Sequence, residues 1–210
     1  MGFQRILLPL AVVPLLWAGT ELDDRLKTVE KRYNRARTLE VLFQESYTAP
    51  GRPRRTESGA LRLLKPGKMR WDYTSPQGKL FLSDGKSLWL YTPNNHRVEK
   101  IKLKESEDMR APLAFLLGKL DFSKEFRNIE ARPEGADLLV TAEPASENLP
   151  YTRVEFVITP DSEIRRVKVT GYDQSVLDFR FDQEKLNPPL DAKLFQFRMP
   201  PGAELAEEAQ

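Results

Sequence analysis

From residue 38 onward, the chain is dominated by short segments in which apolar and polar residues alternate with a period of two. The segment TLEVLFQESY, residues 38–47, places Leu39, Val41 and Phe43 on one side. Segments of this kind recur at short intervals as far as residue 181, with turn residues between them. Because successive side chains of a strand point to opposite faces, this pattern predicts a long antiparallel sheet with one apolar face.

One hairpin in this region carries an unexpected charge. The segment LRLLKPGKMRWDYTSP, residues 61–76, reads as two strands joined by a Lys-Pro-Gly turn. Counting back by twos from the turn, Lys65 falls in line with Leu63, Leu61 and Gly59. The sequence therefore predicts a cation at the end of an apolar row on the face that a sheet normally buries.

Two segments break the strand pattern. In TELDDRLKTVEKRYNRAR, residues 20–37, Leu22, Leu26, Val29 and Tyr33 recur at helical spacing and form a narrow apolar stripe on a charged helix. The segment APLAFLLG, residues 111–118, predicts a short helix that is apolar nearly all round. We expect both helices to cover one mouth of a curved sheet.

The first 19 residues have the two-part pattern of a secretory signal. Arg5 precedes an apolar run at residues 6–18, although Pro9 and Pro14 interrupt it. An uncleaved anchor is the alternative. No later segment approaches the ~20 apolar residues that span a bilayer. We expect residues 1–19 to be a signal peptide and residues 20–210, which show no repeat or linker, to form one exported domain.

Composition and motifs exclude several classes of protein. The 33 basic and 31 acidic residues are mixed along the chain, which argues against a nucleic-acid binder. There is no cysteine, and His96 is the single histidine, so the chain has few of the residues that form a nucleophilic catalytic triad. No H-E-x-x-H pattern or histidine cluster suggests a metal, and no glycine-rich loop suggests a phosphate site. We expect no enzymatic activity, no metal and no cofactor.

Several motifs together resemble the LolA family, the periplasmic carriers of outer-membrane lipoproteins. The most specific are the proline-to-tryptophan strand start in KPGKMRW, the hairpin SDGKSLWLY and the segment PLAFLL. The ending DAKLFQFRMPPGAEL is similar to the F-x-F-x-x-P-x-G pattern of the family. The resemblance covers most of residues 20–210. It implies a mainly β (α+β) fold, an incomplete, curved antiparallel barrel with short α-helices as a lid over a hydrophobic cavity.

The resemblance also implies a function and partners. A member of this family binds the acyl chains of lipoproteins, collects them from an inner-membrane lipoprotein-releasing transporter and passes them to an outer-membrane acceptor. Such a carrier is expected in the periplasm as a monomer. The same half-barrel also serves proteins that bind another lipid or glycolipid, or that sense lipoproteins as stress regulators, and the sequence leaves this alternative open.

The expected site has two parts. The residues expected to bind acyl chains lie on the predicted strands: Phe43, Leu61, Leu63, Met69, Trp71, Leu80, Leu82, Trp89 and Tyr91. The residues expected to contact the sheet from the lid lie on the two helices: Leu26, Val29, Leu116 and Leu117. The same apolar residues could instead be ordinary core.

Lys65 is expected to act as a latch of the lid. The resemblance places it where the family usually has an arginine that donates to the backbone of a lid helix. Because an ammonium group lacks the planar fork of guanidinium, we expect Lys65 to hold the lid less specifically. Alternatively, Lys65 could extend its amine to solvent at the end of a strand.

Overall fold

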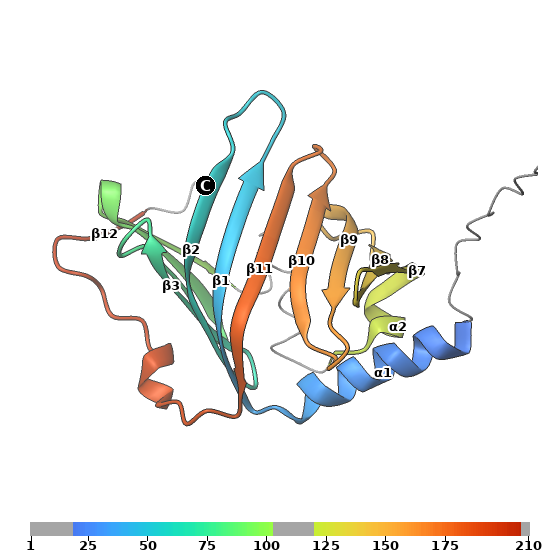
Figure 1. Cartoon of the computed structure of the whole chain (residues 1–210). Helices are drawn as coiled ribbons and strands as arrows, with labels where there is room; N and C mark the ends of the chain where they lie inside the picture. Colours follow the sequence, from blue (N-terminus) through green and yellow to red (C-terminus); the bar gives the residue numbers. More distant parts are fainter. Residues whose placement is uncertain (1–18, 103–119, 207–210) are drawn as a thin grey trace, which may run out of the picture.

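One curved sheet makes up most of the molecule (Figure 1). The computed structural model describes residues 19–102 and 120–206. Its strands follow the order β12-β6-β5-β4-β3-β2-β1-β11-β10-β9-β8-β7. The N-terminal signal and the helix expected at residues 111–118 lie outside the described residues, except that Gly19 is the first residue of a helix.

Two antiparallel meanders build this sheet. The first consists of β1 (Thr38–Thr48), β2 (Arg55–Leu64), β3 (Lys68–Ser75), β4 (Leu80–Asp84), β5 (Ser87–Thr92) and β6 (Arg97–Lys102). The second consists of β7 (Phe126–Glu134), β8 (Asp137–Pro144), β9 (Tyr151–Ile158), β10 (Ile164–Gly171) and β11 (Val176–Leu186). The expected strands are confirmed, as is the turn between β2 and β3.

The meanders join where β1 pairs with β11, with Phe43 opposite Phe181. The sequence pattern did not predict this pairing. A further strand that the sequence did not reveal, β12 (Glu204–Leu205), runs parallel to β6. Within the described ranges, no strand pairing links β7 to β6 or β12, so the barrel is incomplete. The mainly β fold with an open, curved sheet is confirmed.

Helix α1 (Gly19–Arg35) lies across one end of the sheet, at the bottom of Figure 1. Its predicted apolar stripe, Leu22, Leu26, Val29 and Tyr33, is buried. These side chains join the same core cluster as the strands of both meanders. A short helix, α2 (Phe122–Glu125), buries Phe122 in that cluster. No helix within the described ranges has the length and apolar character needed to span a membrane.

The segment after β11 returns along the first meander. It contains a 3₁₀ helix, η4 (Ala192–Phe195), and ends in β12. A second 3₁₀ turn, η1 (Pro93–Asn95), connects β5 to β6. The segment from residue 187 to residue 205 is called the C-terminal strap below.

Candidate functional site

The concave face of the first meander is apolar and buried. Phe43, Leu61, Leu63, Met69 and Trp71 all point to this face, and none is more than 3% exposed. Cross-strand pairing explains their shared side, because Leu61 lies opposite Trp71 and Leu63 lies opposite Met69. Together with inward side chains of β8–β11 they form one cluster. We call this surface the inner face.

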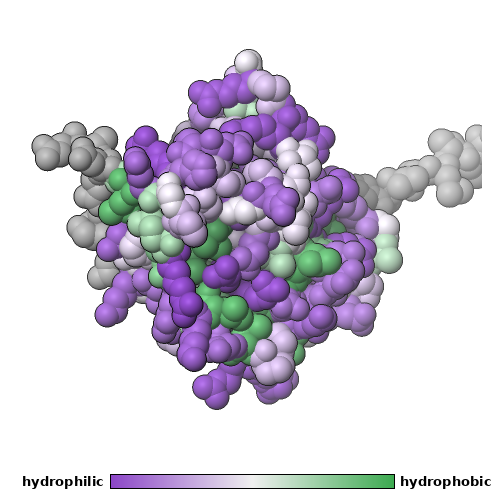
Figure 2. All heavy atoms as spheres, turned by 90° about the vertical axis from the view of Figure 1, so that its left-hand side faces the viewer, coloured by the Kyte–Doolittle hydropathy of each residue, from purple (hydrophilic) through white to green (hydrophobic). Residues whose placement is uncertain are grey.

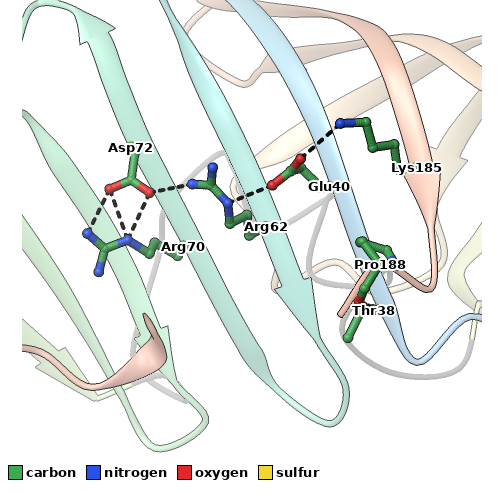
Figure 3. Close-up of polar contacts among 7 residues, drawn as sticks. All are labelled: Thr38, Glu40, Arg62, Arg70, Asp72, Lys185 and Pro188. Carbon is green, nitrogen blue, oxygen red and sulfur yellow. Dashed lines mark hydrogen bonds and ion pairs between the residues drawn. The ribbon is translucent and has the colours of Figure 1, made fainter. Parts of the chain in front are cut away.

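The opposite, outer face of the same strands is charged. Figure 3 shows a row of alternating charges across β11, β1, β2 and β3. Lys185 Nζ lies 3.4 Å from Glu40 Oε1, and Arg62 bridges Glu40 and Asp72 at 2.8 Å each. Arg70 Nη2 lies 2.7 Å from the same Asp72. Hydrogen bonds from Arg62, together with its charge and that of Lys185, lower the pKa of the Glu40 carboxyl group. The contrast between the two faces makes the inner face the candidate apolar site.

Four residues expected to line that site face the other way. Phe81 lies opposite Trp71, so its neighbours Leu80 and Leu82 point to the outer face. Leu82 in turn lies opposite Trp89, and Leu80 opposite Tyr91. Leu80, Leu82, Trp89 and Tyr91, which were expected to bind acyl chains, therefore lie on the outer face.

The C-terminal strap packs over these outer residues. The Phe197 ring stacks on Trp89 with centroids 4.4 Å apart and planes 3° apart. Phe195, also in the F-x-F motif, is buried. A polar groove of about 610 Å³ between strap and sheet is lined by residues that include Arg70, Asp72 and Arg198. Figure 2 looks onto the strap end of the molecule and shows apolar patches among hydrophilic side chains.

Several inner-face residues escaped the sequence analysis. They are Phe81, Leu88 and Leu90 on β4 and β5, and Phe179 and Phe181 on β11. The strap and the core bury both faces of β4 and β5, so their apolar runs are nearly continuous. Alternation therefore did not indicate which of their side chains face inward. Counting by twos across the hairpins from Trp71 would have found Phe81.

The inner face also holds a carboxylate. Glu45 is only 7% exposed, and the Tyr73 hydroxyl donates to its Oε2 at 3.3 Å. Lys79 Nζ pairs with Glu57 and lies 4.4 Å from the centroid of the Tyr73 ring. The inner face therefore changes from apolar to polar toward the end of the strands that is remote from Lys65.

Tyr33 holds the end of α1 to the second meander. Its hydroxyl donates to Glu184 Oε2 at 2.6 Å and accepts from the Ile164 N–H at 2.8 Å. Arg32 Nη2 pairs with Glu184 Oε1 at 2.6 Å, and the Glu184 side chain is only 5% exposed. Burial, and then the negative charge of Glu184, hold the pKa of Tyr33 well above its usual value.

Further polar contacts fix the rest of α1. The Asn34 side chain exchanges two hydrogen bonds with the backbone of Leu120, at 2.7 and 2.8 Å. Glu30 Oε1 accepts from the Phe122 N–H at 2.8 Å, and Arg25 donates to the Thr159 carbonyl. The predicted lid residues Leu26 and Val29 are buried beside these contacts. Leu116 and Leu117 lie outside the described residues.

Lys65 reaches α1 from the first meander. Its Nζ donates to the Tyr33 carbonyl oxygen at 2.9 Å. That carbonyl lies in the last turn of α1 and also accepts from the Ala36 N–H at 3.2 Å. Burial lowers the pKa of Lys65, and no salt bridge to it is found within the described ranges. A void of about 10 Å³ between Lys65, Tyr33 and Leu63 has at most the room of one water molecule.

Within the described residues, no three His, Asp or Glu side chains gather as a metal site would require. His96 lies in an exposed turn with φ of 51°. The geometry thus describes an apolar surface with a helix fastened across one end.

Comparison with known proteins places this geometry in a family. The family model "Outer membrane lipoprotein carrier protein LolA" matches residues 34–198. Outer-membrane lipoprotein carrier proteins of Proteus mirabilis and Azotobacter vinelandii are 24% and 28% identical to this chain. These alignments cover 98% and 99% of this chain, and 99% and 100% of the relatives.

A solved structure of an uncharacterized conserved protein from Thermus thermophilus superposes with a TM-score of 0.52 at 15% identity. The superposition covers 88% of this chain and 98% of that one, and it supports the fold alone. The family match spans most of the chain and includes the inner face, Lys65 and the two phenylalanines of the C-terminal strap, Phe195 and Phe197. The chain belongs to the LolA family of outer-membrane lipoprotein carrier proteins.

Proposed function

We propose that this protein is a periplasmic carrier that shields the acyl chains of lipoproteins on its inner face during transfer from the inner to the outer membrane. The observation that carries the proposal is the apolar inner face closed at one end by α1, in a chain of this family. Residues 1–19 would direct export, and residues 20–210 would form the carrier domain. A transporter would supply the cargo and an outer-membrane acceptor would receive it, with the carrier acting as a monomer.

Cargo binding requires a change in this structure. The inner-face side chains are buried, so an acyl chain can contact them only after a covering element moves. Helix α1 is the element proposed to move, because its buried apolar stripe covers the inner face and hydrogen bonds such as that from Lys65 fasten its end. Each methylene that leaves water contributes about 0.8 kcal/mol. Burial of ten methylenes therefore contributes about 8 kcal/mol. This is comparable to the free energy of unfolding of a whole domain.

The nature of the cargo tests this proposal. The chain is expressed with its N-terminal segment, purified from the periplasm and extracted, and the lipid is identified by mass spectrometry. We expect di- or triacylated lipoprotein chains. Recovery of a glycolipid instead would contradict the lipoprotein carrier, as would absence of the protein from the periplasmic fraction. Sedimentation of the same sample measures its oligomeric state.

Lys65 is the proposed latch between α1 and the first meander. Replacing Lys65→Leu removes the hydrogen bond to the last turn of α1, so we expect a diacylated lipopeptide to load and dissociate about tenfold faster. Stopped-flow measurements with a fluorescent lipopeptide give both rates.

Lys86→Leu is the matched control, because Lys86 is an exposed lysine in the turn between β4 and β5. It should leave both rates unchanged. Equal rates for Lys65→Leu and the unmodified protein would remove the latch role and leave the carrier proposal intact.

A further inference from the structure

The inner face contains a buried hydrogen-bond donor without an acceptor. Trp71 is 0% exposed, and its indole Nε1 has no hydrogen-bond partner among the described residues. The tryptophan of the outer face differs, because Trp89 Nε1 donates to Asp84 Oδ2 at 3.4 Å. The two indoles lie in neighbouring parts of the same meander, so they form a natural comparison.

An orphan of this kind calls for an explanation, since nearly all buried polar atoms in proteins have a partner. Among the described residues, the neighbours of the Trp71 ring offer none. Phe43 and Phe179 lie with ring centroids 4.6 and 5.4 Å away, and the cross-strand neighbours are Leu61 and Phe81. A buried water usually needs at least two polar partners, which these side chains do not supply. The aromatic contacts also fix the direction of the ring.

The chemistry of the site limits which ligand could fill this role. An indole N–H only donates, so the ligand must bring an acceptor. A phosphate or carboxylate would have to leave water for an apolar surface, which is costly without a counter-charge. A neutral carbonyl oxygen next to a long hydrocarbon chain fits both the donor and its surroundings.

We propose that the Trp71 N–H donates a hydrogen bond to an ester carbonyl oxygen that joins a fatty acyl chain to the glycerol of the cargo. This inference rests on the proposed carrier function and adds a recognition element to it. The apolar surface alone would accept any hydrocarbon chain. The indole would favour ester-linked chains and fix the depth to which the chain enters.

A pair of probes isolates this hydrogen bond. One is a synthetic lipopeptide with two palmitoyl esters on its S-glyceryl cysteine, and the other is its dihexadecyl ether analogue, which lacks both carbonyls. We expect the unmodified protein to bind the ester about tenfold more tightly than the ether, equivalent to about 1.4 kcal/mol. Trp71→Phe should abolish this preference, and the control Trp89→Phe should retain it.

Magnetic resonance gives a readout that needs no folded variant at position 71. In protein labelled with ¹⁵N-tryptophan, the ester probe should move the Trp71 indole proton downfield more than the ether does, while the Trp89 signal stays in place. Trp17 lies in the N-terminal segment that export would remove, and Trp89→Phe identifies the Trp89 signal by its loss.

The outcomes separate this inference from the carrier proposal. Equal affinity of the unmodified protein for both probes, or equal Trp71 shifts, would overturn the role of the indole and leave the carrier intact. A preference that survives in a folded Trp71→Phe variant would also overturn it. Failure of both probes to bind would contradict the carrier itself.

Discussion

Tyr33 is the residue at which α1 meets both halves of the sheet. In the second meander, its hydroxyl group donates to Glu184 and accepts from the Ile164 N–H. Its carbonyl group accepts from Lys65 in the first meander. A single residue thus ties the helix to strands that lie far apart in the sequence. Both contacts must break before the end of α1 can leave the sheet.

Replacing Tyr33→Phe should lower the free energy of unfolding by about 1–3 kcal/mol at pH 7, because it leaves the Ile164 N–H and one oxygen of buried Glu184 without a partner. The difference should shrink above pH 10. The folded pKa of Tyr33 is raised, so the unfolded chain releases its proton first and the unmodified protein loses stability as the pH rises. Urea unfolding at pH 7 to 11 measures both effects.

Tyr172→Phe provides the control for this substitution, since Tyr172 is 64% exposed. It should change stability by less than about 0.5 kcal/mol. A Tyr33→Phe variant as stable as the control, or a difference independent of pH, would contradict the structural role assigned to the hydroxyl.

At the scale of the element, the β2–β3 hairpin depends on the absence of a side chain at Gly59. A Cβ atom there would lie 2.0 Å from the Asp72 carbonyl oxygen, a distance no real contact reaches. The pairing register of β2 and β3 shifts at this point, between Ser58 and Gly59. The close approach of the two backbones lets Tyr73 and Phe43 meet edge to face, 5.1 Å apart.

Gly59→Ala should therefore destabilise the protein by about 1–3 kcal/mol or more, because the two strands must move apart. Thermal unfolding followed by circular dichroism measures the loss. An unchanged melting temperature would show that β2 and β3 separate at no cost.

For the whole molecule, the carrier proposal requires α1 to open without unfolding of the sheet. Strands β1, β2 and β11 pair on both sides, whereas α1 is fastened largely by side chains at one end of the sheet. Regions held by fewer backbone pairings open at lower free energy. The two kinds of element should thus differ in hydrogen exchange.

Native-state hydrogen exchange should show α1 amides exchanging through an opening of lower free energy than those of β1 and β11. Sensitivity of that opening to Lys65→Leu, but not to Lys86→Leu, would connect it to the latch. If α1 amides were as protected as those of β1, the helix would open only with the whole domain, and cargo would need another route.

How much could be foreseen differs along the chain. Alternation predicted the strands and the inward direction of Phe43, Leu61 and Trp71, and helical spacing predicted the buried stripe of α1. In β4 and β5 the same reasoning failed for Leu82 and Trp89, because the strap buries the outer face and removes the polar half of the pattern. The expected cation at the end of the apolar row was present, and the structure gave Lys65 its acceptor on Tyr33.

The sequence by itself determined the elements of this protein, because strand and helix periods depend on residues within a few positions of each other. Only the tertiary structure decided the pairing of β1 with β11, the bond from Lys65 to α1 and the covering of Trp89 by Phe197. It also decided that the Trp71 N–H has no acceptor among the described residues. These features join residues that the sequence separates widely, and local patterns carry no record of which distant surface a side chain will meet.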